Sequence, residues 1–239
     1  MEAFAIGSGE VLKVLSAGAV RASLIAAASD YHSRTGCAFT ITFDTAGGVE
    51  KRAASEAPDV FASSMDCLRV IAKAGAVSGE PRAVGSARIA LGVRTGDQAP
   101  DISTLEAFRA ALRNAPKIAR GDSSGGGTAA IHLDGALTRI GVMDEVAAKS
   151  LLRVGGINVM KAVADGLADF GITQSTEIVP VKGVEIGGWL PAEVQLETTY
   201  GVALGAKAAQ AQNAQAFIAW LATPEGARHF ADAGFFPAE

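Results

Sequence analysis

Short apolar runs alternate with segments of helical periodicity along most of this chain. Val11–Ser16, Phe39–Phe43 and Asp59–Ala62 are runs of this kind, and each precedes a segment whose apolar positions follow the helical repeat. The alternation continues through four more apolar runs: Ala87–Val93, Lys117–Ala119, Leu151–Val154 and Asp169–Ile172. Strands that alternate with helices predict an α/β fold whose sheets are mostly parallel and flanked by helices on both faces.

Local signals mark several element ends. Ser103 and Glu106 form a capping-box pattern, which predicts the start of a helix over Leu105–Asn114. Thr223 followed by proline predicts the start of a C-terminal helix. Thr198–Leu204 is a further extended segment that interrupts the strand and helix alternation near the end of the chain.

The most glycine-rich turn is Gly121–Leu133, which lies between an apolar run and a helical segment. A strand-to-helix turn of this kind aims free backbone N–H groups and the positive end of the helix dipole at one point. The stretch therefore predicts an anion-binding cradle. Taken alone, it fits a flexible loop without a ligand equally well.

Small residues also follow the first three predicted strands, at Ala17–Ala19, Asp44–Gly48 and Ser63–Ser64. Carboxyl ends of parallel strands meet at one sheet edge, so these turns are expected to converge there. Arg21 falls in a first helical turn, where a cation is unfavourable beside the dipole. Either a bound anion or a solvent-facing arginine accounts for it.

Composition and charge restrict the ligand classes. The chain has 239 residues, of which 49% are hydrophobic and 19% charged, so it is a globular chain with one large or two modest domains. The net charge is −4 and the basic residues are scattered, which excludes a nucleic-acid surface. Neither a dinucleotide-binding nor a P-loop glycine motif is present, so nucleotide binding is disfavoured.

The sequence leaves two questions open: whether the two cysteines pair, and in which compartment the protein is located. Cys37 and Cys67 could pair if the fold brings them together, although two buried free thiols are favoured. No Cys/His cluster has metal spacing, and neither a metal nor a cofactor is expected. Met1–Glu10 lacks the regions of an export signal. The protein is expected in the periplasm if a signal has been removed, and in the cytoplasm if Met1 is its native start.

Several motifs together resemble type II periplasmic binding proteins, in particular the molybdate-binding-protein-like components of ABC transporters. The matching segments are Val14–Val20, Phe43–Gly48, Asp59–Ser63, Gly126–His132, Gly171–Pro180, Thr223–Ala227 and Ala233–Phe235. Their order and spacing carry the resemblance. It implies two α/β lobes, one formed by residues 1–85 with 200–239 and the other by 86–199. It also implies two hinge strands, near 87–93 and 198–204, and a ligand cleft between the lobes.

The same resemblance bears on the ligand. Molybdate binders of this group offer a serine in the first turn and a serine-rich second turn, whereas this chain has Ala19 and Thr45–Gly48 there. Arg21 suits a carboxylate, because a planar guanidinium binds one through two hydrogen bonds. The segment from Gln174 to Pro180 resembles an organic-acid branch that includes bacterial aconitate isomerases. An organic polycarboxylate is therefore favoured over molybdate.

One hypothesis is a monomeric binding protein that closes over a small anion, a carboxylate or an oxyanion, and docks on an ABC-transporter permease if it is exported. It requires hydrogen-bond donors and no catalytic base. The expected ligand contacts are Gly18, Ala19, Arg21, Thr45, Ala46, Gly47, Ser63, Ser64, Gly126, Gly127, Thr128, Gln174, Ser175 and Tyr200.

The alternative is a cofactor-independent isomerase that shifts the double bond of an unsaturated polycarboxylate. Such a reaction requires a base, an acid and groups that stabilise developing negative charge. The candidates for proton transfer are His132, Glu177, Asp44 and Tyr200. Each also has a structural alternative: a packed histidine, a turn or ion-pair carboxylate, a carboxylate bonded to its own turn, and a core tyrosine.

Overall fold

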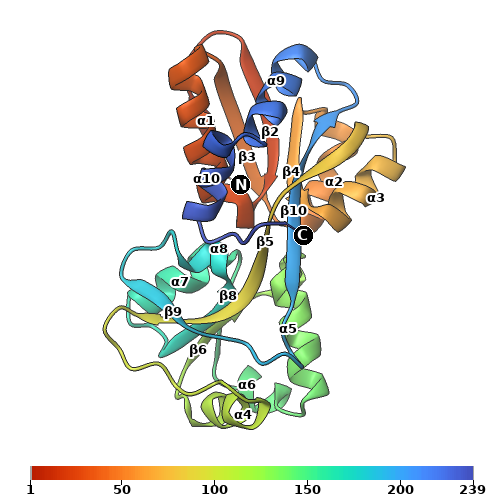
Figure 1. Ribbon diagram of the computed structural model, residues 1–239. Helices are drawn as coiled ribbons and strands as arrows, with labels where there is room; N and C mark the ends of the chain where they lie inside the picture. The colour runs from red at the N-terminus through yellow and green to blue at the C-terminus, as the bar shows by residue number, and fades with distance from the viewer. Residues whose placement is uncertain (1, 239) are drawn as a thin grey trace. The chain divides into compact units, whose positions relative to one another are not determined.

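The computed structural model describes residues 2–238. It divides into two compact units: unit 1 contains the residues up to Ser86 together with those from Thr198 onward, and unit 2 contains Ala87–Glu197. Each unit combines a sheet with helices (Figure 1). The predicted α/β class is confirmed. No helix of the described chain is long and apolar enough to cross a membrane.

Unit 1 is built on the strand order β1-β3-β2-β4-β10. The strands are β1 (Glu2–Ile6), β2 (Val11–Ala17), β3 (Ala38–Asp44), β4 (Val60–Ser64) and β10 (Glu197–Gly205). β2 runs parallel to both β3 and β4, and Val14 pairs with Ile41 on one side and Val60 on the other. β1 and β10 run antiparallel to their neighbours.

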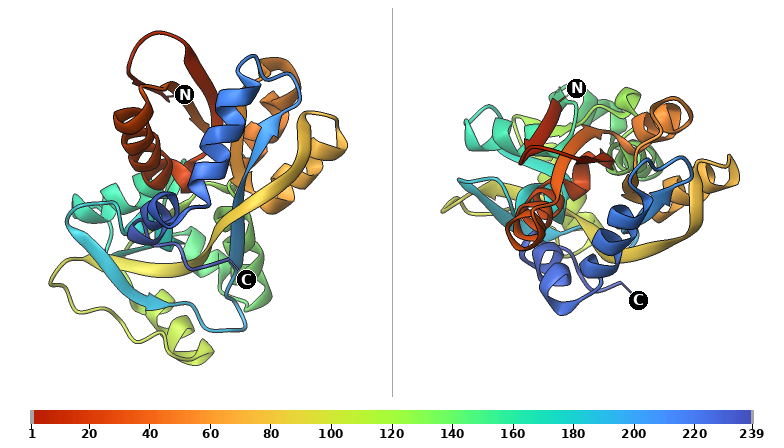
Figure 2. Two further views of the ribbon diagram at one scale, coloured as in Figure 1. Left: turned by 45° about the horizontal axis from the view of Figure 1, so that its top comes forward. Right: turned by 90° about the horizontal axis from the view of Figure 1, so that it is seen from above.

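Helices cover both faces of the unit 1 sheet. They are η1 (Gly18–Val20), α1 (Arg21–Thr35), α2 (Ala46–Glu56), α3 (Met65–Lys73), α9 (Ala211–Leu221) and α10 (Pro224–Asp232). Val49 of α2 and Leu68 of α3 pack with Phe61 of β4 in one buried cluster. Aromatic rings of α1 and α9 pack against Phe39 of β3, with Phe217 centred 4.8 Å from it. Figure 2 shows α1 and α9 from two further sides.

Unit 2 has the strand order β5-β8-β6-β7, with β9 paired to β5. Its strands are β5 (Val77–Arg94, which begins in unit 1), β6 (Ile118–Gly121), β7 (Ser150–Arg153), β8 (Phe170–Gln174) and β9 (Val184–Trp189). Its helices are α4 (Leu105–Asn114), η2 (Ser123–Gly125), α5 (Thr128–Arg139), α6 (Met143–Ala147), α7 (Gly156–Ala164) and α8 (Ser175–Ile178). Phe108 and Leu137 belong to one buried cluster, and Val159 and Ile178 to a second.

The prediction of mostly parallel sheets is wrong outside the central strands. β6 is parallel to β7 and β8, whereas β5 is antiparallel to both β8 and β9. Helical crossovers produce the parallel pairs, because each returns the chain to the same edge before the next strand begins. β5 and β10 do not follow such crossovers within the units, so both sheets are mixed.

One local prediction also needs correction. Thr104, not Ser103, caps α4, because its Oγ1 accepts the N–H of Ala107 at 3.1 Å. The Ser103 N–H is instead bonded to the Asp101 carboxylate, although the predicted range Leu105–Asn114 is confirmed. β1 is a further element, which no pattern in the sequence predicts and which pairs antiparallel with β3.

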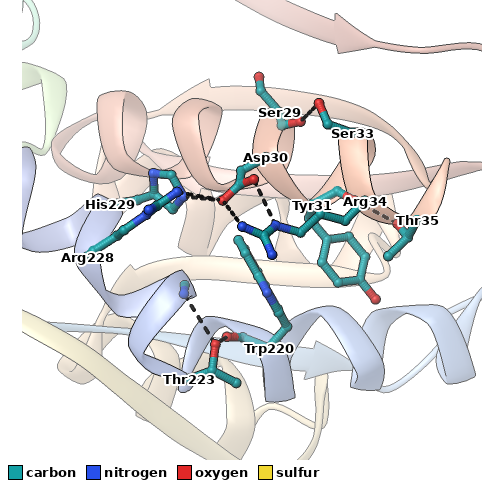
Figure 3. Close-up of polar contacts among 11 residues, drawn as sticks. Ser29, Asp30, Tyr31, Ser33, Arg34, Thr35, Trp220, Thr223, Arg228 and His229 are labelled. Carbon is teal, nitrogen blue, oxygen red and sulfur yellow. Dashed lines mark hydrogen bonds and ion pairs between the residues drawn. The ribbon is translucent and has the colours of Figure 1, made fainter.

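A charge cluster joins the first and last helices of unit 1. Arg34, Arg228 and His229 all converge on the Asp30 carboxylate, at 2.9, 3.1 and 3.0 Å (Figure 3). Hydrogen bonds from Arg34 and then His229 lower the pKa of Asp30 from 3.8 to about 2. The closing helix α10 is thereby held on α1, consistent with their packing in the same unit.

Candidate ligand-binding site

Parallel strands bring predicted site residues to one edge within each unit. In unit 1, β2, β3 and β4 end at Ala17, Asp44 and Ser64, and their parallel register places these ends together. In unit 2, the parallel strands β6, β7 and β8 end together in the same way. The predicted ligand contacts thus form two groups, one in each unit.

The turn before α2 is filled by its own side chains. Asp44 Oδ1 accepts the Thr45 N–H at 2.8 Å, and Thr45 Oγ1 accepts the Gly48 N–H at 3.0 Å. Arg52 binds the other Asp44 oxygen at 3.0 Å. A Cβ at Gly48 would lie 2.1 Å from the Asp44 carboxylate, so a larger residue there would displace this carboxylate. Thr45 is therefore the N-cap of α2, and the Asp44 carboxylate lies beside it, bonded to the Thr45 N–H and to Arg52. Ligand contact by the Thr45–Gly47 segment stays a prediction.

The turn before α7 is filled by Glu177 from further along the chain. Its Oε1 accepts the Gly156 N–H at 2.9 Å, and its Oε2 accepts the Thr173 hydroxyl at 2.7 Å. Burial raises the pKa of this carboxyl, while the two hydrogen bonds lower it in part. Both oxygens of Glu177 are thus bonded and buried in this structure, and its role in proton transfer stays a prediction.

The glycine-rich turn before α5 is different. The Asp122 carboxylate accepts the backbone N–H and the hydroxyl of Ser124, at 3.0 and 2.7 Å, and these bonds lower the pKa of Asp122. They belong to η2 and not to α5. α5 begins after Gly127, and among the described residues it has neither a side-chain cap nor an acidic residue in its first turn. Its first N–H groups lack helical acceptors, as at any helix start.

The start of α1, like that of α5, lacks a side-chain cap among the described residues. The helix follows η1 at Val20, and within the described chain no side chain caps it and no acid lies in its first turn. Arg21 is confirmed as its first helical residue, and its guanidinium lies 4.4 Å from the centroid of the Phe43 ring. Phe43 belongs to β3 near its carboxyl end. Arg21 is thus held beside the same sheet edge as the residues Gly18 and Ala19.

The serines after β4 and the polar residues after β8 are buried. Ser64 caps α3 by accepting the Cys67 N–H at 3.3 Å. Burial raises the pKa of the Cys67 thiol, and the nearby Ser63 hydroxyl lowers it in part. Among the described residues, the Ser63 hydroxyl has no hydrogen-bond partner of normal geometry. The same holds for the buried hydroxyl of Thr176, a candidate that the sequence pattern does not identify. Gln174 beside it is also buried.

The remaining proton-transfer candidates pack within their own units. His132 Nε2 lies 3.0 Å from the carbonyl oxygen of Val194. Tyr200 is only 2% exposed, and its ring meets that of Phe235 edge to face at 5.7 Å. These contacts match the structural alternatives that the sequence left open: a packed histidine for His132 and a core tyrosine for Tyr200. Cys37 and Cys67 are free thiols, and only Cys67 is buried.

One cavity in unit 2 lies away from the strand ends that carry the predicted ligand contacts. A cavity of about 760 Å³ in unit 2 is lined by Arg94 and Phe170 among others. It lies where β8 begins and β5 ends, the edge opposite to Gln174. In the described part of the chain, no group of three His, Cys, Asp or Glu side chains could hold a metal ion.

Known proteins resemble this chain over nearly its whole length. A family model described as a bacterial extracellular solute-binding protein matches residues 12–236. An aconitate isomerase from a Pseudomonas species is 29% identical over 233 residues, which cover 95% of this chain and 87% of that protein.

Solved structures share the fold. The periplasmic molybdate-binding protein of Azotobacter vinelandii superimposes with a TM-score of 0.79 at 19% identity, over 95% of this chain and 100% of that one. A periplasmic thiamin-binding protein gives a TM-score of 0.76 at 12% identity, over 95% and 83%. One is named for molybdate and the other for thiamin, so this likeness carries no ligand assignment.

Proposed function

We propose that this chain, which belongs to the family of bacterial extracellular solute-binding proteins and has the fold of type II periplasmic binding proteins, binds a small organic polycarboxylate. The observation that carries the proposal concerns the helices that follow two of the parallel strands, α1 after β2 and α5 after β6. α1 and α5 each begin without a side-chain cap or a first-turn acid among the described residues. By contrast, the Thr45 hydroxyl caps α2, and the Glu177 carboxylate accepts the first N–H of α7.

An uncapped helix start favours an anion through its free N–H groups and its dipole. The candidate donors are the amides after Gly18 in unit 1 and after Gly127 in unit 2. Arg21 adds a cation at α1, and its planar guanidinium can bind a carboxylate through two hydrogen bonds. The likeness to an aconitate isomerase supports the same class of ligand.

We further propose that units 1 and 2 act as the two lobes of the family fold, with β5 and β10 as the connecting strands. In this proposal each unit contributes hydrogen-bond donors, and the ligand shifts a conformational equilibrium of the protein. A periplasmic location and delivery of the ligand to an ABC-transporter permease follow from the family and belong to the same proposal.

Isothermal titration with cis-aconitate, trans-aconitate, citrate, molybdate and sulfate tests the ligand class. A carboxylate at a hundred times its dissociation constant should stabilise the fold by about 2.7 kcal/mol, which a thermal scan detects. The matched variants are Arg21→Ala and Arg69→Ala, since Arg69 lies exposed on α3 and pairs only with Asp66 among the described residues. Binding of molybdate with no binding of carboxylates would overturn the proposal.

Isomerisation of aconitate is a second candidate, favoured by the relative that covers 95% of this chain. It would need one of His132, Glu177, Asp44 and Tyr200 to leave its present contacts. Incubation of trans-aconitate with stoichiometric protein, followed by proton NMR, tests it directly. Absence of the cis isomer, together with measurable binding, would exclude the enzyme and retain the binding protein.

A further inference from the structure

Glu177 is a buried acidic side chain, and among the described residues no ion pair compensates for its burial. It lies in α8, a helix of four residues that follows Gln174 directly. Among the described residues its partners are hydrogen-bond donors: the Gly156 N–H, the Thr173 hydroxyl and the backbone of Gln174. Burial penalises a charge in this position, and these donors offset part of that penalty because they replace water.

The surroundings are shaped for a carboxylate. Gly156 is the first residue of α7, a nine-residue helix, and its preceding residue Gly155 has a φ of 80°. A Cβ at position 156 would lie 2.1 Å from both Glu177 Oε2 and Thr173 Oγ1. The missing side chain is therefore what lets the carboxylate reach the helix start. An anion at a helix N-terminus also gains from the dipole.

We propose that Glu177 is a positioning residue: its carboxylate fills an internal anion site between α7 and β8 and so holds the Gln174–Thr176 turn in place for the ligand. The positioning part rests on the proposed function, in which this turn contributes donors. A helix as short as α8 is not stable by itself. The bonds from Glu177 to Gly156 and Thr173 tie it to two longer elements. The neighbouring Gln174, Ser175 and Thr176 are all at most 2% exposed.

Chemical rescue tests the internal site without any ligand of the protein. Glu177→Ala removes the side-chain atoms that acetate possesses, a methyl carbon and a carboxylate. We expect acetate to raise the Tm of this variant by about 3–6 °C over chloride at equal ionic strength. The Tm of the wild type and of Glu145→Ala, whose carboxylate forms an exposed pair with Arg113, should change equally little. An equal effect of acetate on all three proteins would overturn the site.

Titration with the best-bound carboxylate from the ligand screen tests positioning. Glu177→Ala should bind it about tenfold more weakly, and acetate should restore part of the loss. Wild-type affinity in Glu177→Ala would overturn the positioning role. If Glu177→Ala does not fold, Glu177→Gln, which keeps one acceptor oxygen, replaces it in the titration with the same criterion. If the wild type binds no carboxylate, the proposed function fails, while the acetate rescue still decides the internal site.

Discussion

The imidazole Nε2 of His229 lies 3.0 Å from Oδ2 of Asp30, although 199 positions separate the two residues in the chain. Arg34 and Arg228 bind the same carboxylate. One acidic side chain therefore connects α1 to the closing helix α10. Because α1 also carries Arg21 at its start, this cluster supports the helix on which the proposed ligand contact lies.

Unit 1 should lose the support of this cluster in acid. The folded-state pKa of Asp30 is about 2, below the value of 3.8 for an unperturbed carboxyl. A depressed pKa contributes stability above pH 3.8, and this contribution disappears as the pH falls through 2. Asp30→Asn should therefore have a lower Tm than the wild type at pH 7, and the two Tm values should converge near pH 2. A constant difference across this range would contradict the assignment.

Gly156→Ala should destabilise the protein. The added methyl carbon would meet Glu177 Oε2 and Thr173 Oγ1 at 2.1 Å, which displaces a buried hydrogen-bonded carboxylate. We expect a loss of about 2–4 kcal/mol in urea unfolding. Gly135→Ala is the matched control, since nothing lies within 4 Å of its added Cβ in α5. It should gain about 0.5–1 kcal/mol from helix propensity. Equal effects at the two positions would refute the packing argument.

Arg120 should stabilise α5 on the unit 2 sheet. This buried side chain of β6 binds the Asp134 carboxylate on α5, and its Nε donates to Ser150 Oγ at 2.7 Å. Arg120→Met should cost about 2 kcal/mol, because Asp134 keeps partial access to water. Arg113→Met removes an exposed pair and should change stability by about 0–1 kcal/mol. A double-mutant cycle with Asp134→Asn measures the coupling, and additive effects would argue against it.

Arg21→Ala should weaken carboxylate binding by about 10- to 100-fold, the loss expected for a charged hydrogen bond. The affinity of Arg69→Ala should equal that of the wild type. Thermal unfolding without ligand separates binding from stability, because Arg21 also packs on Phe43. An unchanged affinity in Arg21→Ala would make Arg21 a surface residue.

Local pattern was sufficient for much of the fold. Apolar runs and helical periodicity predict the elements, because both depend on neighbours within a few residues. The range of α4, the helical position of Arg21 and the small-residue turns after β2, β3 and β4 all follow from it. Sheet direction at β5 and β10 does not, since strand pairing there joins residues that are distant in the chain.

The sequence by itself determined the α/β elements and the turns that can face an anion. Only the tertiary structure decided which turns the chain fills itself. The Thr45 hydroxyl caps α2 from the adjacent position, but the Glu177 carboxylate reaches the start of α7 across 21 positions. A carboxylate finds its donors by distance in space, and no local pattern encodes that distance. The glycine-rich start of α5 therefore remains a candidate for an external anion, whereas the glycine pair before α7 already holds an internal one.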